Sequence, residues 1–153
     1  MKRRPMLSAD LKPVYAIEQQ ANEFPWHYNH FTDCLQASYS AFVFEDDSAS
    51  MIGYTVLQKV VDELHVLNIC VRPEVQGKGY GRQIMNSIID LARSQHVATI
   101  YLEVRRSNLR AQALYMRTGF NEIAVRKNYY PAHGGREDAI LMAMDLTVPW
   151  SGA

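Results

Sequence analysis

The sequence predicts a mixed α/β (α+β) domain around a central sheet that is mostly antiparallel. Apolar, strand-like runs in the first half of the chain follow one another with only tight turns between them, which is typical of antiparallel strands. Segments with helical periodicity precede and follow these strands. The length of 153 residues suits one domain with its own core, and we expect about six to seven strands and about four helices. The domain is expected at residues 1–146, followed by a tail at 147–153.

The N-terminal half predicts two helices and three strands. Ser8 to Asp10 offer capping side chains to a helix that carries Val14 and Ile17 at core spacing. The triplet Phe24-Pro25-Trp26 then changes the chain direction before a shorter helix. That helix is expected at about residues 29–37, and strands are expected at 41–44, 51–61 and 64–71, with a tight hairpin at Asp62-Glu63.

The C-terminal half alternates helices and strands. Apolar spacing predicts a helix at 82–92, and another from about Asn108 should end before Gly119, a residue type that favours the position after a helix. In a strand at 99–104, Ile100, Leu102 and Val104 share one face while Thr99, Tyr101 and Glu103 share the other. Final strands are expected at 120–126 and 139–146, joined by a polar, turn-rich loop.

Composition and charge exclude several classes of protein. The formal net charge is zero, which argues against broad electrostatic binding to nucleic acid or an anionic membrane. Two cysteines are too few for a disulfide scaffold and suit a reducing compartment. The basic N-terminus lacks the apolar segment of a secretion signal, and no apolar run approaches membrane-spanning length. We therefore expect a soluble, cytoplasmic protein, and separately we expect a monomer.

The run VRPEVQGKGYGR at residues 71–82 is the most informative motif. It joins a predicted strand to a predicted helix and carries Gly77, Gly79 and Gly81. Such a loop lets backbone amides approach an anion, and the following helix directs its positive end to the same place. A Walker loop would need Ser or Thr after Lys78, and a dinucleotide fingerprint would need a third glycine where Arg82 or Ile84 stands. A glycine-rich turn without a ligand is the structural alternative.

Gln76 to Gly81 fit the Gln/Arg-x-x-Gly-x-Gly/Ala loop, and the chain resembles the GCN5-related N-acetyltransferases (GNAT) over about residues 5–146. Within that superfamily it is most similar to the RimI type, the ribosomal-protein alanine N-acetyltransferases. This closer resemblance rests on five ordered runs: FPW at 24–26, LEVRRSN at 102–108, ALYMRTGF at 113–120, RKNYYP at 126–131 and GREDAILM at 135–142.

The resemblance implies acetyl-CoA as co-substrate, and the sequence gives no reason to expect a metal. The amides from Gln76 to Arg82 would surround the pyrophosphate, and the backbone at Ile69 to Val71 would contact the pantetheine and acetyl groups and supply an oxyanion donor. The residues that it assigns to the cofactor are Ile69, Cys70, Val71, Gln76, Gly77, Lys78, Gly79, Tyr80, Gly81, Arg82 and Asn108.

Glu103 is the candidate general base. It lies opposite the apolar face of its strand, and an amino terminus with a pKa near ~8 needs to lose a proton before it can attack. The alternative is a carboxylate at the strand end that pairs with Arg105 or another cation. The LEVRRSN run favours the catalytic role, and acceptance of the proton directly or through one water both remain open.

Tyr115 is the candidate acid for the departing thiolate. It lies seven residues after Asn108, so both share one face of the predicted helix. A phenol with a pKa near ~10 can donate to a thiolate. The alternative is a tyrosine that is only packed in the core.

The acceptor site is expected among aromatic residues in loops. Phe24, Trp26, Tyr129 and Tyr130 would frame a peptide cleft, and Glu137 would hold a basic group. Simple packing of Phe24 and Trp26, or a solvated Glu137, is the structural alternative.

The expected acceptor is the N-terminal alanine of small-subunit ribosomal protein number eighteen, acetylated by direct transfer in a ternary complex. Cys70 has no predicted His or Asp partner that would support a covalent acetyl-enzyme. His27 and His30 lack a third metal ligand. A small amine or lysine acceptor, and a noncatalytic module that binds acetyl-CoA, remain alternatives.

Overall fold

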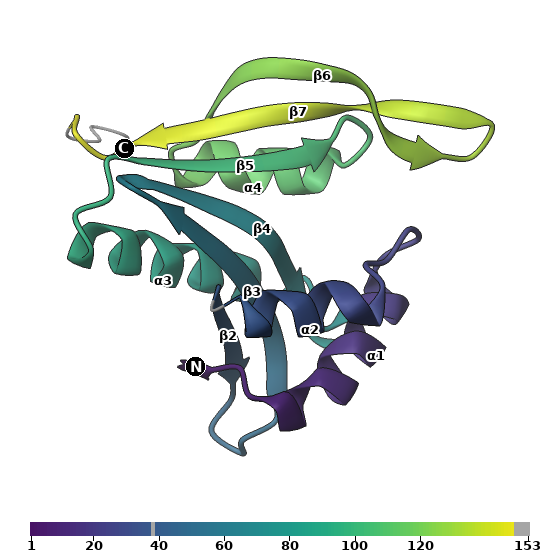
Figure 1. Cartoon of the computed structure of the whole chain (residues 1–153), viewed down its shortest axis with the longest axis vertical. Coiled ribbons are helices and arrows are strands. Elements are labelled where there is room, and N and C mark those ends of the chain that lie inside the picture. Colours follow the sequence, from purple (N-terminus) through teal and green to yellow (C-terminus); the bar gives the residue numbers. More distant parts are fainter. Residues whose placement is uncertain (38, 149–153) are drawn as a thin grey trace.

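The computed structural model describes residues 1–37 and 39–148, and within them seven strands form one sheet in the order β1-β2-β3-β4-β5-β7-β6 (Figure 1). The strands are β1 (Lys2–Pro5), β2 (Ser40–Glu45), β3 (Met51–Val60), β4 (Glu63–Val71), β5 (Thr99–Arg105), β6 (Asn121–Ala132) and β7 (Gly135–Asp145). The helices are α1 (Leu11–Ala21), α2 (Tyr28–Gln36), α3 (Tyr80–Ser94) and α4 (Leu109–Thr118). Among these strands only β4 and β5 pair in parallel, so the predicted mostly antiparallel class is confirmed.

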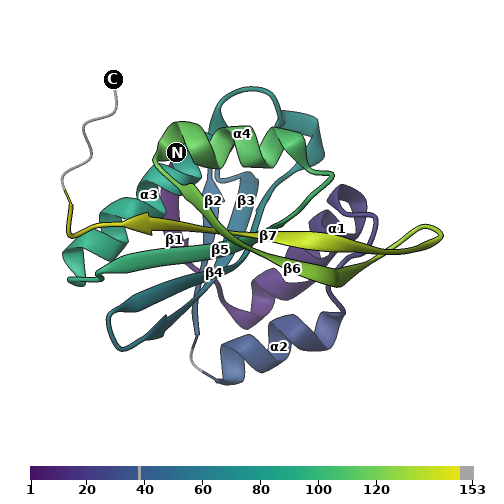
Figure 2. The ribbon, with the colours of Figure 1, turned by 90° about the horizontal axis from the view of Figure 1, so that it is seen from above.

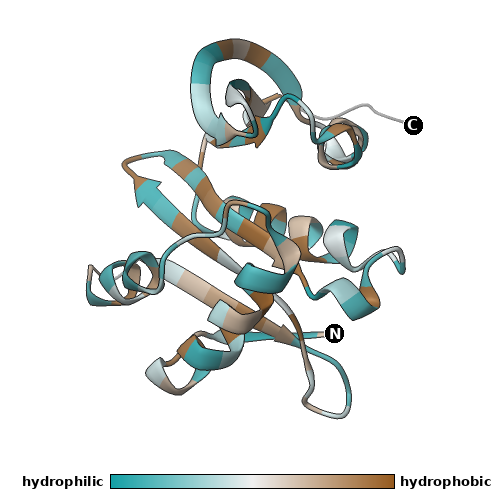
Figure 3. Cartoon of the chain, turned by 90° about the vertical axis from the view of Figure 1, so that its right-hand side faces the viewer, coloured by the Kyte–Doolittle hydropathy of each residue, from teal (hydrophilic) through white to brown (hydrophobic). Residues whose placement is uncertain are grey.

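The helices cover the two faces of the sheet in pairs, α1 and α2 on one face and α3 and α4 on the other (Figure 2). Each pair packs on its own hydrophobic cluster. Val14 and Phe31 meet Val43 beneath α1 and α2, while Ile84 and Ile100 lie beneath α3 and α4. Figure 3 shows the apolar stretches of the strands between these layers. The main contacts of α1 and α2 with the sheet are to β2, β3 and β4, so within the described residues the β5-β7-β6 part of that face is less covered by helices.

Strands β4 and β5 pair over only part of their length. The parallel register runs from Glu63 opposite Thr99 to Val66 opposite Leu102 and then ends. At this point Leu67 is an extra residue in β4, because Val66 and Asn68 lie opposite consecutive residues of β3. A bulge of this kind bends a strand and increases its twist. Beyond it β4 diverges from β5, as Figure 1 shows, and the diverging ends are where the site forms.

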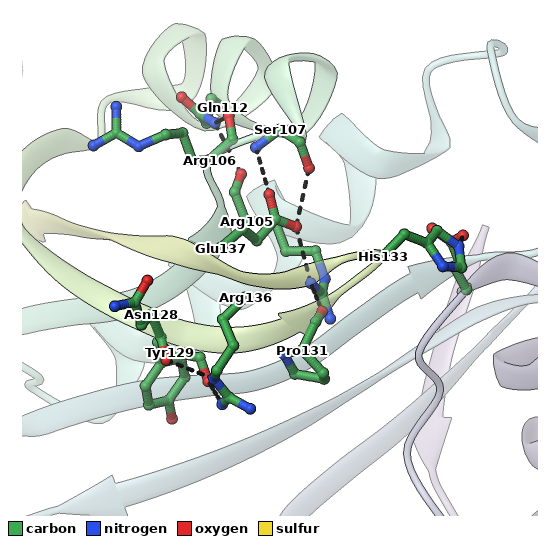
Figure 4. Close-up of polar contacts among 11 residues, drawn as sticks. Arg105, Arg106, Ser107, Gln112, Asn128, Tyr129, Pro131, His133, Arg136 and Glu137 are labelled. Atoms are coloured by element: carbon green, nitrogen blue, oxygen red, sulfur yellow. Dashed lines mark hydrogen bonds and ion pairs between the residues drawn. The ribbon is translucent and has the colours of Figure 1, made fainter.

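The prediction of a loop between residues 126 and 139 is wrong. Strand β6 continues to Ala132 and β7 already begins at Gly135, so the two form one long hairpin. The polar residues are accommodated by a bulge in which Asn128 has a positive φ of 53°. Arg136 donates to the carbonyls of Asn128 and Tyr129, both at 2.8 Å, and Asp138 accepts from the Asn128 amide at 3.0 Å. Side chains thus replace the backbone hydrogen bonds that the bulge removes from the β6–β7 ladder (Figure 4). For this reason β6 remains a strand although its sequence is typical of a turn.

Strand β1 was not predicted, although it falls within the expected number of strands. Its sequence is short and basic, and it pairs only at the edge of the sheet with β2. Arg4 holds it in place by donating to Asp10 and Glu45 at 2.8 to 3.0 Å. The described residues contain no helix with both the length and the hydropathy to cross a membrane. Of the predicted tail, residues 149–153 lie outside the described part of the chain.

Candidate functional site

The glycine loop connects η2, the 3-10 turn at Pro73–Val75, to α3, and its glycines serve different purposes. Gly77 and Gly79 adopt left-handed conformations, with φ of 80° and 86°. Gly81 is inside the helix, where an added Cβ would stand 3.2 Å from the Leu114 side chain. The first helical hydrogen bond joins the amide of Gln83 to the carbonyl of Gly79, so the amides of residues 80–82 precede it and point out of the helix end. The loop therefore presents several N–H donors together.

A pocket of about 570 Å³ lies in front of this loop and the start of α4. Its lining includes the predicted Val71, Gln76, Gly77, Gly79, Tyr80, Gly81, Arg82 and Asn108. Arg110 and Arg117 of α4 add two cations that were not predicted, whereas Lys78 and Cys70 are not part of this lining. Three arginines and the amides of a helix N-terminus suit a ligand with several phosphates.

A second cavity of about 760 Å³ occupies the space where β4 and β5 diverge. Its walls bring together Ile69 on β4, Glu103 on β5 and Tyr115 on α4. Asn108 borders both cavities, so they adjoin at the start of α4. The Asn108 side-chain oxygen accepts the Ala111 amide at 3.1 Å and caps that helix. We call this cavity the cleft.

Backbone groups of β4 face the cleft. The Arg72 amide donates to the Ile52 carbonyl across the β3–β4 ladder at 2.7 Å. Bonded and non-bonded positions alternate along an antiparallel ladder, so Cys70 also bonds to β3 while Ile69 and Val71 turn their N–H groups the other way. That is the side from which β5 has diverged. Ile69 and Val71 therefore offer main-chain donors to the cleft, whereas Cys70 is buried, with its thiol pKa raised by desolvation to about 11.

Glu103 lines the cleft from the face of β5 opposite Ile100, Leu102 and Val104, as predicted. Its carboxylate lies 3.5 Å from the Nε atom of Arg126, and about a quarter of its side chain is exposed. A cation does pair with it, but that cation is Arg126 and not Arg105. The arrangement leaves a partly exposed carboxylate beside the diverging strands, able to accept a proton from a group in the cleft.

Tyr115 is buried in the cluster beneath α4 and also borders the cleft. Burial raises the pKa of its phenol well above the usual value, and the neighbouring Tyr130 and Cys70 act in the same direction. The phenol therefore stays protonated to higher pH than a free tyrosine would. Tyr115 therefore packs in the core and also contacts the cleft.

Arg105 contacts both sides of the cleft at the end where the acceptor is expected. Its guanidinium lies 4.8 Å from the ring centre of Phe24 and 4.5 Å from that of Tyr130. It also donates to the Pro131 carbonyl at 2.7 Å and to Glu137 at 2.9 Å (Figure 4). The α1–α2 segment is thereby tied to the β6–β7 hairpin, and cation–π contacts of this kind strengthen when water is excluded.

The predicted acceptor residues divide into three groups. Phe24, Trp26 and Tyr130 line the cleft, but Tyr130 does so from β6 and not from a loop. Tyr129 borders a neighbouring cavity of about 310 Å³ together with Trp26 and Glu103. Glu137 is absent from the linings of these cavities and accepts from Arg105 and Ser107, which lowers its pKa. It supports Arg105 and does not face the cleft.

Sequence reasoning missed Glu18, the most buried carboxylate in the cleft wall, with 3% exposure. Its signal was present, because a charged residue four positions after Val14 falls on the apolar face of α1. Among the described residues no group of three or more His, Cys, Asp or Glu side chains is arranged to hold a metal ion.

The sequence model of the acetyltransferase (GNAT) family matches residues 6–120. Over 141 residues the chain is 41% identical to the ribosomal protein bS18-alanine N-acetyltransferase of Escherichia coli strain K12, covering 92% of this chain and 95% of that one. The chain belongs to the GNAT family. It is an N-acetyltransferase, and enzymes of this family take their acetyl group from acetyl-CoA.

Further relatives agree with this assignment. The corresponding enzyme of Haemophilus influenzae is 38% identical to this GNAT chain over 140 residues, with 91% and 94% coverage. The crystal structure of the ribosomal-protein-S18-alanine N-acetyltransferase from Escherichia coli superimposes with a TM-score of 0.89 at 38% identity, covering 99% of this chain and 97% of that one. A spermidine N-acetyltransferase chimera from Vibrio cholerae and hSSAT reaches a TM-score of 0.85 at 21% identity over 95% of each chain, which shows a shared fold alone.

The left-handed conformation of Gly79 in the glycine loop of this GNAT chain leads to a prediction for coenzyme A binding. Replacing Gly79 with valine is expected to weaken binding at least about tenfold, because a β-branched residue at a φ of 86° costs more than 1 kcal/mol and displaces the amides. Isothermal titration calorimetry with coenzyme A measures the change in the dissociation constant. Gly134→Val is the matched control, since Gly134 also has a positive φ and open surroundings but lies in the β6–β7 turn. Equal weakening in both variants would contradict the prediction.

Proposed function

We propose that the enzyme acetylates the α-amino group of a protein N-terminus, specifically the N-terminal alanine of ribosomal protein bS18. Two relatives that are 38% and 41% identical and cover more than nine-tenths of the chain, those of Escherichia coli and Haemophilus influenzae, carry this specificity in their names. The observation that carries the proposal is that Glu103 and Tyr115, from different elements, line one cleft beside the backbone donors of β4. A base, an acid and oxyanion donors are the groups that acyl transfer to an amine requires.

The pocket in front of the glycine loop fits the phosphates of acetyl-CoA. The amides of residues 77–82 and the guanidinium groups of Arg82, Arg110 and Arg117 would hold the pyrophosphate and neutralise its charge. The acyl arm would pass Asn108 into the cleft, along the edge of β4 that β5 leaves free. Tyr80 borders the pocket from which this path starts, and the Ile69 and Val71 amides lie at its end.

The chemistry assigned to the side chains is direct transfer. Glu103 accepts one proton from the acceptor ammonium, directly or through a water, and the neutral amine then forms a bond to the thioester carbonyl carbon. The amide of Ile69 or Val71 donates to the oxygen as negative charge develops there. As the carbon–sulfur bond breaks, Tyr115 donates its proton to the sulfur, which leaves as the thiol. The nitrogen loses its second proton as the amide forms, and that proton returns to the Tyr115 phenolate, directly or through water. Cys70 takes no part, because it is buried and desolvation raises the pKa of its thiol to about 11, which keeps it protonated.

The acceptor would enter between the α1–α2 segment and the β6–β7 hairpin. Phe24, Trp26 and Tyr130 supply rigid apolar walls, and Tyr129 borders the adjoining cavity over the open face of the sheet. A small first side chain such as alanine suits a cleft that these large rings line. Glu137 contributes through Arg105, which it holds by an ion pair at 2.9 Å.

Acetyl transfer to three acceptors tests the proposal. The acceptors are a peptide with the N-terminal sequence of bS18, the same peptide with a blocked N-terminus and an internal lysine, and spermidine. We expect turnover with the first and at most about 1% of that rate with the other two, since only the first presents an α-amine on an extended chain. Transfer to lysine or spermidine alone would overturn the acceptor, and binding of acetyl-CoA without transfer to any amine would indicate a noncatalytic module.

A further inference from the structure

Glu18 is a buried carboxylate on the wall of the cleft that the mechanism above does not use. Only 3% of the residue is exposed, and it lines the cleft from the last turn of α1. Its Oε1 atom accepts from the Tyr54 hydroxyl at 2.7 Å and from the Asn68 side-chain amide at 2.9 Å. Its Oε2 atom accepts from the Trp26 backbone amide at 3.1 Å. These donors come from β3, from β4 and from the α1–α2 segment.

All three donors are neutral, which distinguishes Glu18 from the other acids of the cleft. Three carboxylates line the cleft in the described part of the chain: Glu18, Glu23 and Glu103. Glu23 pairs with His133, and Glu103 pairs with Arg126. The ion pairs of residues 1–37 and 39–148 include no partner for Glu18. A buried charge is costly unless a counter-charge balances it, so the cleft wall is prepared for a cation.

We propose that Glu18 binds the protonated amino terminus of the acceptor before Glu103 removes its proton. This inference rests on the proposed function, because it names a specificity residue of the same cleft. A carboxylate oxygen has about two acceptor positions, and Oε2 uses one of them for the Trp26 amide, which leaves one for an ammonium. Such a contact selects a charged amino terminus over a blocked or uncharged chain end, and it acts on affinity and not on the chemical step.

The position of Glu18 supports a contact with the amino terminus and not with a later residue of the acceptor. Asn68, which donates to Glu18, immediately precedes Ile69, whose amide faces the cleft beside the expected acetyl group. Trp26, whose amide donates to the other oxygen, lies on the acceptor side. Glu18 therefore stands between the acetyl end and the acceptor end of one cavity, where the reacting amine has to arrive.

Binding to the enzyme with coenzyme A in place of acetyl-CoA tests the inference without turnover. The probes are the bS18 N-terminal peptide and its des-amino analogue, in which a propionyl group replaces the first alanine and removes the charge. Titration calorimetry at neutral pH is expected to show the amine peptide binding wild type at least about tenfold more tightly. Glu18→Gln should reduce this preference about tenfold, chiefly by weakening the amine peptide, while Glu18→Asp should restore part of it. In steady-state assays Glu18→Gln should raise KM for the peptide and leave kcat within about threefold.

Tyr54→Phe is the matched control, because it removes one hydrogen bond to Glu18 and keeps the charge. It should leave the preference for the amine peptide within about twofold of wild type. If Glu18→Gln and Tyr54→Phe weaken both peptides equally, Glu18 only supports the structure and the inference is wrong. An equal affinity of wild type for the two peptides overturns it without any variant. If the wild-type enzyme neither binds nor acetylates the amine peptide, the proposed function itself fails.

Discussion

Glutamine in place of Glu103 is expected to lower kcat for acetylation of the bS18 peptide by about 10²- to 10⁴-fold, the range typical of a lost general base. The variant keeps the size of the side chain, so binding of coenzyme A should not change. Because a deprotonated amine needs no base, the loss should shrink as the pH rises past the pKa of the amino terminus, near ~8. Steady-state rates between pH 6 and pH 9.5, together with titration of coenzyme A, measure both effects.

Arg126→Ala provides the comparison that separates catalysis from structure. It breaks the ion pair with Glu103, which spans 3.5 Å between Nε and Oε1, but leaves the carboxylate in the cleft. The pair is half exposed on the arginine side, and exposed pairs contribute about 1 kcal/mol or less. We expect Arg126→Ala to change kcat by less than about tenfold. A loss equal to that of Glu103→Gln would show that the pair, and not the base, matters.

Removal of the Tyr115 hydroxyl, as in Tyr115→Phe, is expected to reduce kcat by about 10²-fold, with KM for the peptide and affinity for coenzyme A nearly unchanged. In the proposed mechanism the phenol donates to the leaving sulfur, so its loss should affect the transition state and not ground-state binding. Burial raises the Tyr115 pKa, and a group with a raised pKa keeps its proton as the pH rises. The wild-type kcat should therefore show no decline centred at the ordinary phenol pKa near ~10.

Tyr130→Phe is the natural comparison for Tyr115→Phe. Tyr130 also lines the cleft, and burial near Glu103 raises its pKa to about 12. Because it lies on the acceptor side against Arg105, its substitution should act mainly on KM for the peptide. If the two variants have the same effect on kcat and KM, Tyr115 has no special role in the departure of the thiol.

Local patterns predicted most of the fold because they depend on near neighbours. The alternation of β5 placed Glu103 opposite Ile100 and Leu102, and Gly119 ended α4 in a left-handed conformation with a φ of 113°. The long β6–β7 hairpin was missed because distant side chains stabilise it. Arg136 and Asp138 take over the hydrogen bonds of the bulge at Asn128, and no propensity of residues 127–129 reveals that.

The site was predictable where a motif defines it and not where tertiary contacts do. The glycine loop gave most of the residues that line the phosphate pocket, but Arg110 and Arg117 join it only because α4 packs beside α3. Glu137 was expected to face the acceptor, yet it binds Arg105 and Ser107. The partner of Glu103 turned out to be Arg126, which reaches it from β6 across β7.

The divergence of β4 from β5 also affects how this site can change during evolution. The donors that it releases at Ile69 and Val71 belong to the main chain, so any residue except proline can supply them. The side chains of Ile69 and Val71 pack against the core cluster, so they can change among apolar types while the donors stay in place. If the proposed acceptor site is correct, changes in the α1–α2 segment and the β6–β7 hairpin can alter the acceptor without rebuilding these main-chain donors.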